Sequence, residues 1–122
     1  MLVKLSDLWN ARATLGKLAT MSFKSKTSYK LMKLIDQANK ELEPFGKVRQ
    51  EVFLKYGDQD GEKIVVRQDE IEAFTKEMEE LELQEIDLKF PVTLDELSNA
   101  DLTPSELFDL NFMFVEEIAV PQ

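Results

Sequence analysis

The most regular pattern in the chain is a row of apolar residues separated by alternating steps of four and three positions. Such a row forms the side on which a helix packs lengthwise against another helix. We call it the seam; its members are Leu31, Ile35, Ala38, Leu42, Phe45, Val52 and Tyr56. It predicts one long helix that begins at Thr27 or Ser28 and stops before Gly57, with a kink near Leu42 where Pro44 removes a backbone hydrogen bond.

Three further segments are predicted to be helices. The first runs from Ser6 to Thr20, with Ser6 as its cap. Asp69 is placed to cap the second, which has a narrow apolar stripe of Ile71, Phe74, Met78 and Leu81. The third begins at Thr103-Pro104-Ser105-Glu106, which has the form of a capping box. This last helix is apolar on most faces as far as Ile118, so we expect it to be buried in the core.

Two segments have the character of strands. Ile64-Val65-Val66 is short and β-branched, and residues 84–92 alternate apolar and charged side chains. We expect these two strands to pair, and a short helix to follow from Thr93 to Ser98. The predicted fold is mainly α with a minor β part. It is a helical bundle with one long kinked helix and a small two-stranded β element, in a single domain over residues 1–122.

Cysteine and histidine are both absent from the 122 residues. Disulfides, thiol or imidazole catalysis and the usual zinc, haem and iron–sulfur sites are therefore excluded. The turn at residues 57–63 lacks the key ligands of a calcium loop and the spacing of a phosphate-binding loop. Asp60, Asp87 and Lys89 could be combined into a metal-dependent hydrolase, but the alternation of a strand explains them equally well. We expect no catalytic residue, no metal and no cofactor.

Charge divides the chain into two unequal parts. Residues 1–56 contain 11 Lys and Arg against 5 Asp and Glu, whereas the remainder contains 4 against 19, within a net charge of −9. The two parts can neutralise each other inside the molecule or provide surfaces for a partner. The acidic helix presents the strongest candidate surface for a protein partner, with Glu70, Glu72, Glu77, Glu79, Glu80 and Glu82. Arg49, the polar residue within the seam, can fix register or partner choice, or extend to solvent.

The basic segment before the long helix supports a different hypothesis. Lysines there alternate with two aromatic residues, so that cations could neutralise phosphates while rings stack on bases. The residues concerned are Phe23, Lys24, Lys26, Tyr29 and Lys30. A nucleic-acid-binding module is therefore the alternative function, although the acidic chain as a whole makes nucleic acid an unfavourable partner.

Five segments of the chain form a pattern that extends over nearly its whole length. They are Leu15-Gly16-Lys17-Leu18, Tyr29-Lys30-Leu31-Met32-Lys33-Leu34, Glu41-Leu42-Glu43-Pro44-Phe45, Lys55-Tyr56-Gly57-Asp58 and Leu102-Thr103-Pro104-Ser105-Glu106-Leu107. In these segments the chain resembles a family of small proteins of unknown function from tailed bacteriophages and prophages. It implies a phage accessory protein that acts by contact, and it brings no catalytic residue.

These observations together predict a phage or prophage protein without catalytic activity that works by protein–protein contact. Two variants remain open. One is a virion assembly or structural component, and the other is an inhibitor of a host defence protein that uses an acidic, nucleic-acid-like face. The partner would be a phage or host protein, and a homo-oligomer is possible. No apolar run near Met1 has the length of a signal peptide or a membrane span, so we expect a location in the host cytoplasm or the virion.

Overall fold

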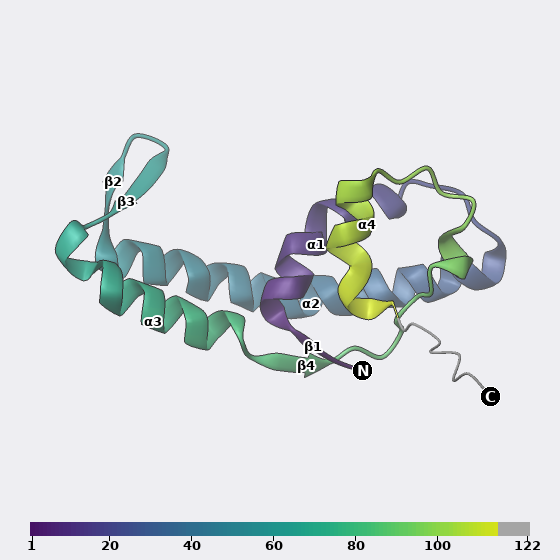
Figure 1. Ribbon diagram of the computed structural model, residues 1–122, viewed down its shortest axis with the longest axis horizontal. Coiled ribbons are helices and arrows are strands. Elements are labelled where there is room, and N and C mark those ends of the chain that lie inside the picture. Colours follow the sequence, from purple (N-terminus) through teal and green to yellow (C-terminus); the bar gives the residue numbers. More distant parts are fainter. Residues whose placement is uncertain (115–122) are drawn as a thin grey trace, which may run out of the picture.

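The structure is organised around α2, a helix of 32 residues from Ser25 to Tyr56 along which the other elements pack (Figure 1). The computed structural model describes residues 1–114. The predicted seam is confirmed, because its members Leu31, Ala38, Leu42, Phe45 and Val52 are buried. The start of the helix was predicted slightly too late, since Lys24 is the N-cap residue and neither Thr27 nor Ser28 caps the helix. The fold is mainly α with a minor β part, as predicted.

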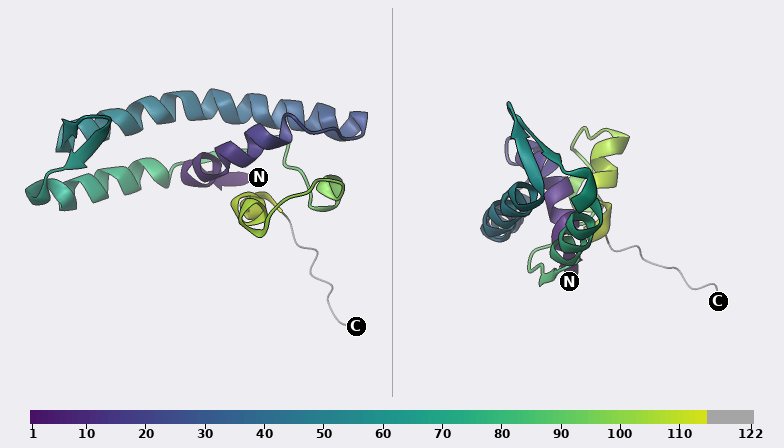
Figure 2. Two further views of the ribbon diagram at one scale, coloured as in Figure 1. Left: turned by 90° about the horizontal axis from the view of Figure 1, so that it is seen from above. Right: turned by 90° about the vertical axis from the view of Figure 1, so that its left-hand side faces the viewer.

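Pro44 lies inside α2 without interrupting it. Proline cannot donate a hydrogen bond to the carbonyl of Lys40, and both residues lie on the exposed side of the helix. Water can therefore bond that carbonyl, which keeps the cost of the lost bond small. The helix follows a shallow arc (Figure 2). The seam keeps its phase on both sides of Pro44 because the helix is one continuous element.

The larger part of the molecule, which we call the body, is built from α1 (Leu5–Leu18), the first part of α2 and α4 (Pro104–Leu110). α1 contacts both other helices and buries one face, formed by Leu8, Ala11, Leu15 and Leu18. The expected cap at Ser6 is wrong, because the N-cap residue is Lys4 and the Leu5 amide instead donates to the carbonyl of Gln84 at 2.9 Å. α1 therefore begins directly from a strand.

The strands form two separate antiparallel pairs. β1 (Leu2–Lys4) pairs with β4 (Glu85–Asp87), and β2 (Gly57–Asp60) pairs with β3 (Lys63–Val66) in a hairpin whose turn contains Gly61 at φ 63°. The predicted pairing of the two strand segments with each other is wrong. α3 (Ile71–Glu82) separates them, and a helix of 12 residues holds its two ends about 18 Å apart. Each strand therefore pairs with a segment at its own end of that helix.

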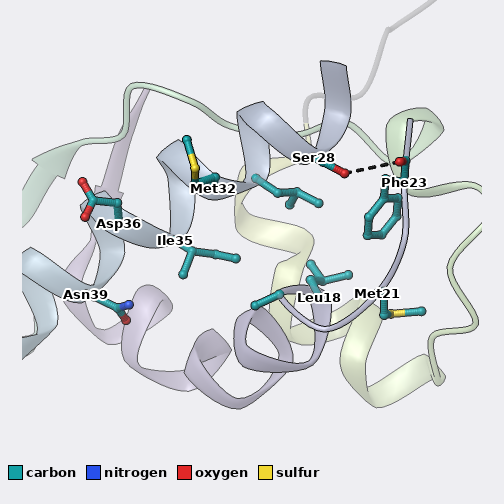
Figure 3. A pocket seen from close by; sticks show the side chains of 10 residues that line it. Leu18, Met21, Phe23, Ser28, Met32, Ile35, Asp36 and Asn39 are labelled. Carbon is teal, nitrogen blue, oxygen red and sulfur yellow. Dashed lines mark hydrogen bonds between the residues drawn. The ribbon is translucent and has the colours of Figure 1, made fainter. Parts of the chain in front are cut away.

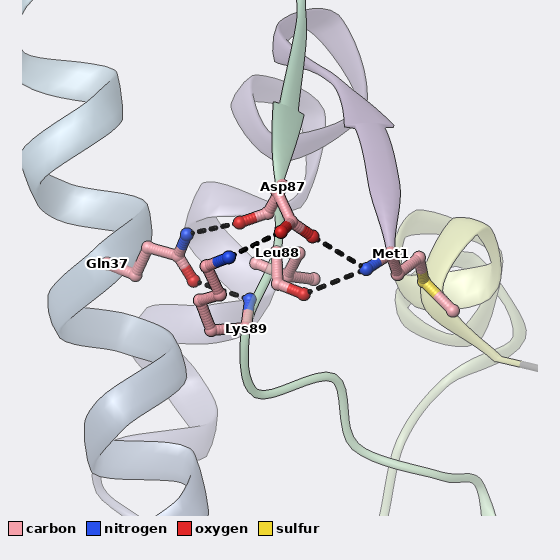
Figure 4. Close-up of polar contacts among 5 residues, drawn as sticks. All are labelled: Met1, Gln37, Asp87, Leu88 and Lys89. Atoms are coloured by element: carbon pink, nitrogen blue, oxygen red, sulfur yellow. Dashed lines mark hydrogen bonds and ion pairs between the residues drawn. The ribbon is translucent and has the colours of Figure 1, made fainter.

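A polar cluster connects the β1–β4 pair to the middle of α2 (Figure 4). The Gln37 side-chain amide donates to the Asp87 carbonyl at 2.7 Å, and its oxygen accepts from the Lys89 amide at 2.9 Å. The Met1 amino group donates to the Asp87 carboxylate at 2.8 Å, and Lys89 forms an ion pair with the same carboxylate. Leu88, at the centre of this cluster, is almost fully buried. The strand β4 ends at Asp87 because from this residue on the backbone bonds to the Gln37 side chain and to Met1.

The last described segment confirms one prediction and corrects another. The capping box is present, because the Glu106 amide donates to the Thr103 hydroxyl and the Thr103 amide donates to the Glu106 carboxylate. The helix is shorter and less buried than expected. It ends at Leu110 and continues as a 3-10 turn, η3 (Asn111–Met113), while Phe108 is 80% exposed. The predicted continuation to Ile118 lies outside the described residues.

Residues 49–82 form an arm that extends away from the body (Figures 1 and 2). In the arm, α3 runs antiparallel to the end of α2, and the β2–β3 hairpin and a 3-10 turn, η1 (Gln68–Glu70), connect the two helices. Asp69 lies within that turn and makes no cap, which corrects the expectation for it. Val52 and Met78 are buried in the arm but lie outside the main core cluster. The arm thus has a small apolar core of its own.

The short helix expected at residues 93–98 is a single 3-10 turn, η2 (Asp95–Leu97), whose Leu97 is buried in the body. Among residues 1–114, no helix is sufficiently long and apolar to cross a membrane.

We predict that Leu34→Ala lowers the free energy of unfolding by about 2 to 5 kcal/mol, because Leu34 is completely buried where α2 meets the core of the body. Met32→Ala on the same helix is the matched control. Its side chain is 55% exposed, so we expect a change below about 0.5 kcal/mol. Urea denaturation of both variants measures the difference, and equal effects would contradict this assignment of the core.

A second prediction concerns pH. The Lys89 ammonium, and after it the amino group of Met1, lowers the pKa of Asp87 to about 2. A carboxylate whose pKa is lower in the folded than in the unfolded state adds stability that is complete above pH 4 and is lost as the pH falls towards 2. Asp87→Asn should therefore be less stable than the parent protein at pH 6, and the gap should close in acid. Urea titrations at several pH values test this, and a gap independent of pH would contradict it.

Candidate functional site

The outer face of α3 carries exposed residues from the acidic candidate surface. Phe74, Met78 and Leu81 form the inner side of the helix, where Met78 is buried, so the residues on the opposite side face solvent. Ile71 belongs to the predicted stripe but is 49% exposed at the start of the helix. Three of the predicted partner-binding residues lie on the exposed side, Glu72, Glu79 and Glu80. We call these three residues the outer glutamates.

Within residues 1–114, the outer glutamates form no ion pair. Lys76 lies among them at the spacings of three and four residues that place side chains next to one another on a helix. Even so, no carboxylate of the described residues lies within ion-pair range of the Lys76 nitrogen. The structure thus uses none of these three carboxylates to hold α3 in place.

Glu77 has a different position from the other glutamates of α3. Its carboxylate accepts a hydrogen bond from the Tyr56 hydroxyl and forms an ion pair with Lys55 at 3.1 Å. The bond from Tyr56, and then that from Lys55, lowers the pKa of Glu77, while the bond to Glu77 raises the pKa of both Tyr56 and Lys55. Glu77 therefore connects α3 to the end of α2. Glu70 and Glu82, the two remaining acidic candidates, are half-buried at the ends of the helix.

Arg49 lies where the body meets the arm. Its guanidinium carbon is 5.1 Å from the centre of the Trp9 ring and 4.8 Å from that of Phe53. Arg12 approaches the same indole at 4.0 Å. A guanidinium over an aromatic ring is attracted by the negative face of the ring and keeps its N–H groups free for other acceptors. The sequence identified Arg49 as unusual, but Trp9 and Arg12 come from α1 and were not predicted to join it.

The basic segment is divided by the fold. Lys24, Lys26 and Tyr29 are exposed, whereas Phe23 is half-buried against the core of the body. Lys30 forms an ion pair with Glu96 at 2.8 Å. Of the two aromatic rings in the alternative nucleic-acid site, only that of Tyr29 is exposed for stacking on a base. One of the three lysines of that site, Lys30, is already neutralised by an ion pair within the protein.

The division of charge is partly resolved inside the molecule. Three ion pairs join a lysine of the basic first part to a glutamate of the acidic remainder, namely Lys17 to Glu106, Lys30 to Glu96 and Lys55 to Glu77. On the body, Lys17 of α1 is neutralised by a glutamate of α4, and Lys30 of α2 by a glutamate of η2. The outer glutamates, by contrast, have no such counterpart in the described part of the chain.

A cavity of about 390 Å³ lies between the end of α1 and the start of α2 (Figure 3). Most of its lining is apolar, including Leu18, Met21 and Ile35, and Asp36 and Asn39 lie at one end. Ser28 donates to the Phe23 carbonyl at 3.3 Å, so its hydroxyl proton is already used. The cavity has the size of a small-molecule pocket but brings no acid–base pair together. Among residues 1–114, no three carboxylates are grouped closely enough to hold a metal ion.

Comparison with known proteins adds no relative. No family model, no curated protein and no solved structure matches this chain. The resemblance to a phage family therefore stays a prediction from the sequence.

We predict that Glu77→Gln lowers the melting temperature and Glu80→Gln does not. Both changes remove one negative charge from α3, but only Glu77 bonds to Tyr56 and Lys55. Thermal melts at pH 7 compare the two variants directly. Equal melting temperatures would show that the Glu77 contacts do not stabilise the arm.

Proposed function

We propose that this chain is a phage or prophage protein without catalytic activity that binds another protein through the outer glutamates of α3. The supporting observation is that these three carboxylates are exposed and serve no ion pair of the described fold. Glu79 lies three residues from Glu82, and Glu80 lies three residues from Glu77, so each has a like charge beside it on the helix. A use in binding accounts for carboxylates that the fold itself does not use.

The position of α3 suits this role. The helix lies on the arm, away from the body, so a partner can reach it without displacing any element (Figure 1). Carboxylates on an exposed helix attract basic surfaces over a Debye length of about 8 Å at physiological salt. The expected partner is a phage or host protein with exposed lysines or arginines.

Charge density favours contact with individual basic side chains over imitation of DNA. Glu72 and Glu80 are separated by about 12 Å along the helix, over which a DNA duplex carries about seven phosphates. In the same length α3 has the three outer glutamates on its exposed face, with Lys76 among them. We therefore favour the virion assembly variant over an inhibitor that copies a nucleic acid.

We predict that the combined variant Glu72→Gln/Glu79→Gln/Glu80→Gln folds normally and loses its partner. Affinity capture from the infected host, with the captured proteins identified by mass spectrometry, compares this variant with the parent protein. With a purified partner, the association rate of the parent should fall as NaCl rises from about 50 to about 300 mM, over which the Debye length shortens about 2.5-fold. The variant should show little salt dependence.

The control is Lys24→Gln/Lys26→Gln, which removes two exposed charges from the basic segment. It should capture the same partner as the parent protein. If this control loses the partner while the glutamate variant keeps it, the proposal fails. A gel shift with single-stranded nucleic acid that weakens steeply with salt would then support the alternative function.

A further inference from the structure

Two arginines and two aromatic rings form an uninterrupted series at the junction of body and arm. Arg12 and Arg49 both lie over the ring of Trp9, and Arg49 also lies over Phe53. We call these four residues the arginine cluster. Arg12 is exposed, and the other three members are half-buried. Tryptophan and arginine are the residues most enriched among those that dominate protein–protein binding energies.

The two guanidinium groups have donors to spare. Arg12 donates to the Trp9 carbonyl at 2.6 Å, and neither Arg12 nor Arg49 forms an ion pair with a carboxylate in residues 1–114. Each guanidinium has five N–H donors in a fixed plane, a geometry that matches a carboxylate. The remaining N–H groups of both arginines are therefore available to donate to a carboxylate of a second molecule, in a chain whose net charge is −9.

The surroundings favour individual carboxylates over a polyphosphate chain. Glu62 and Gln59 of the hairpin line a small pocket together with Arg49, and Asp7 and Asp109 line another with Arg12. These acids would repel a nucleic-acid backbone, in which charges follow one another closely. Two separated carboxylates meet less repulsion from these acids than a backbone that carries a charge at every nucleotide.

Glu72 and Glu79 of α3 are close enough to each other for each to reach one arginine of the cluster. Because both guanidinium carbons lie close to one ring centre, they are at most about 9 Å apart. Glu72 and Glu79 lie on the same side of α3, about 10 Å apart along its axis. The 9 Å is an upper limit, and flexible glutamate side chains can bring their two carboxylates to that separation or closer. Leu83, which follows Glu79 by one helical turn and is 55% exposed, can then meet the aromatic part of the cluster.

The two surfaces cannot meet within one molecule. The outer glutamates lie on the side of α3 opposite the stripe that packs against α2, whereas Arg49 belongs to the seam of α2 itself. We propose that the arginine cluster of one copy binds the outer glutamates of a second copy. This inference rests on the proposed function, because it names a partner for the same acidic face. Two different surfaces that pair in this way produce rings or open chains of copies.

Charge reversal tests the contact. Arg12→Glu/Arg49→Glu makes both surfaces acidic, and Glu72→Arg/Glu79→Arg makes both surfaces basic. Each variant should be monomeric alone, and an equimolar mixture should associate, because each then offers the surface that the other lacks. Sedimentation equilibrium from about 10 µM to 1 mM protein measures this. In the same range the parent protein should associate at least about tenfold more tightly than either variant.

Two controls address folding and site specificity. Lys40→Glu and Glu43→Arg reverse charges that are exposed on α2 outside both surfaces, and should leave association unchanged. Circular dichroism checks folding. If Arg49→Glu unfolds the protein, Arg12→Gln/Arg49→Gln replaces it, with a loss of association as the expected result. Trp9 is the one tryptophan of the chain, so its emission should shift with protein concentration in the parent.

The proposal is overturned if the parent protein is monomeric at concentrations up to about 1 mM. It is also overturned if the mixture of reversed variants stays monomeric, or if the arginine variant associates as the parent does. None of these results affects capture of another protein by the outer glutamates, so failure here can be told apart from failure of the proposed function.

Discussion

The burial of one side of α2 is the interaction on which the rest of the structure depends. Its seam meets α1 in the body and α3 in the arm, so one helix provides a packing surface for two groups of elements. A helix of this length gains little from hydrogen bonding alone and is stable because its apolar side is covered. Since the seam keeps its phase through Pro44, the two groups pack on the same side of α2.

The arm has far less support than the body. Its buried apolar residues are Val52 and Met78, and next to them the rings of Phe53 and Phe74 lie 5.0 Å apart. The bond of Tyr56 to Glu77 therefore matters more here than a surface contact usually does, because it joins α3 to α2 near the hairpin. An arm with a small core opens locally at a lower free energy than the body. A partner bound to α3 would stabilise the arm by the free energy of binding.

Local chemistry made most of the fold predictable, and long-range contacts account for what was missed. The seam and the Thr103 capping box depend on residues a few positions apart, and both were predicted correctly. The strand pairing was wrong because β4 pairs with β1, more than 80 residues away, and no short pattern encodes that choice. The special position of Glu77 was missed for a related reason, since the five glutamates of α3 look alike until Tyr56 lies opposite one of them.

Arg49 shows why a charged residue occupies the seam. At this point the partner of α2 changes from α1 to α3, and the buried Val52 and Met78 beyond it lie outside the main core cluster. An aliphatic side chain here would face Trp9 and Phe53 but leave an apolar surface in contact with water at the junction. Arginine covers both rings with its planar guanidinium and still leaves N–H groups in reach of solvent or a carboxylate. The same residue therefore closes the junction between body and arm and supplies a charged group for a partner, so its structural role and its binding role have one physical cause.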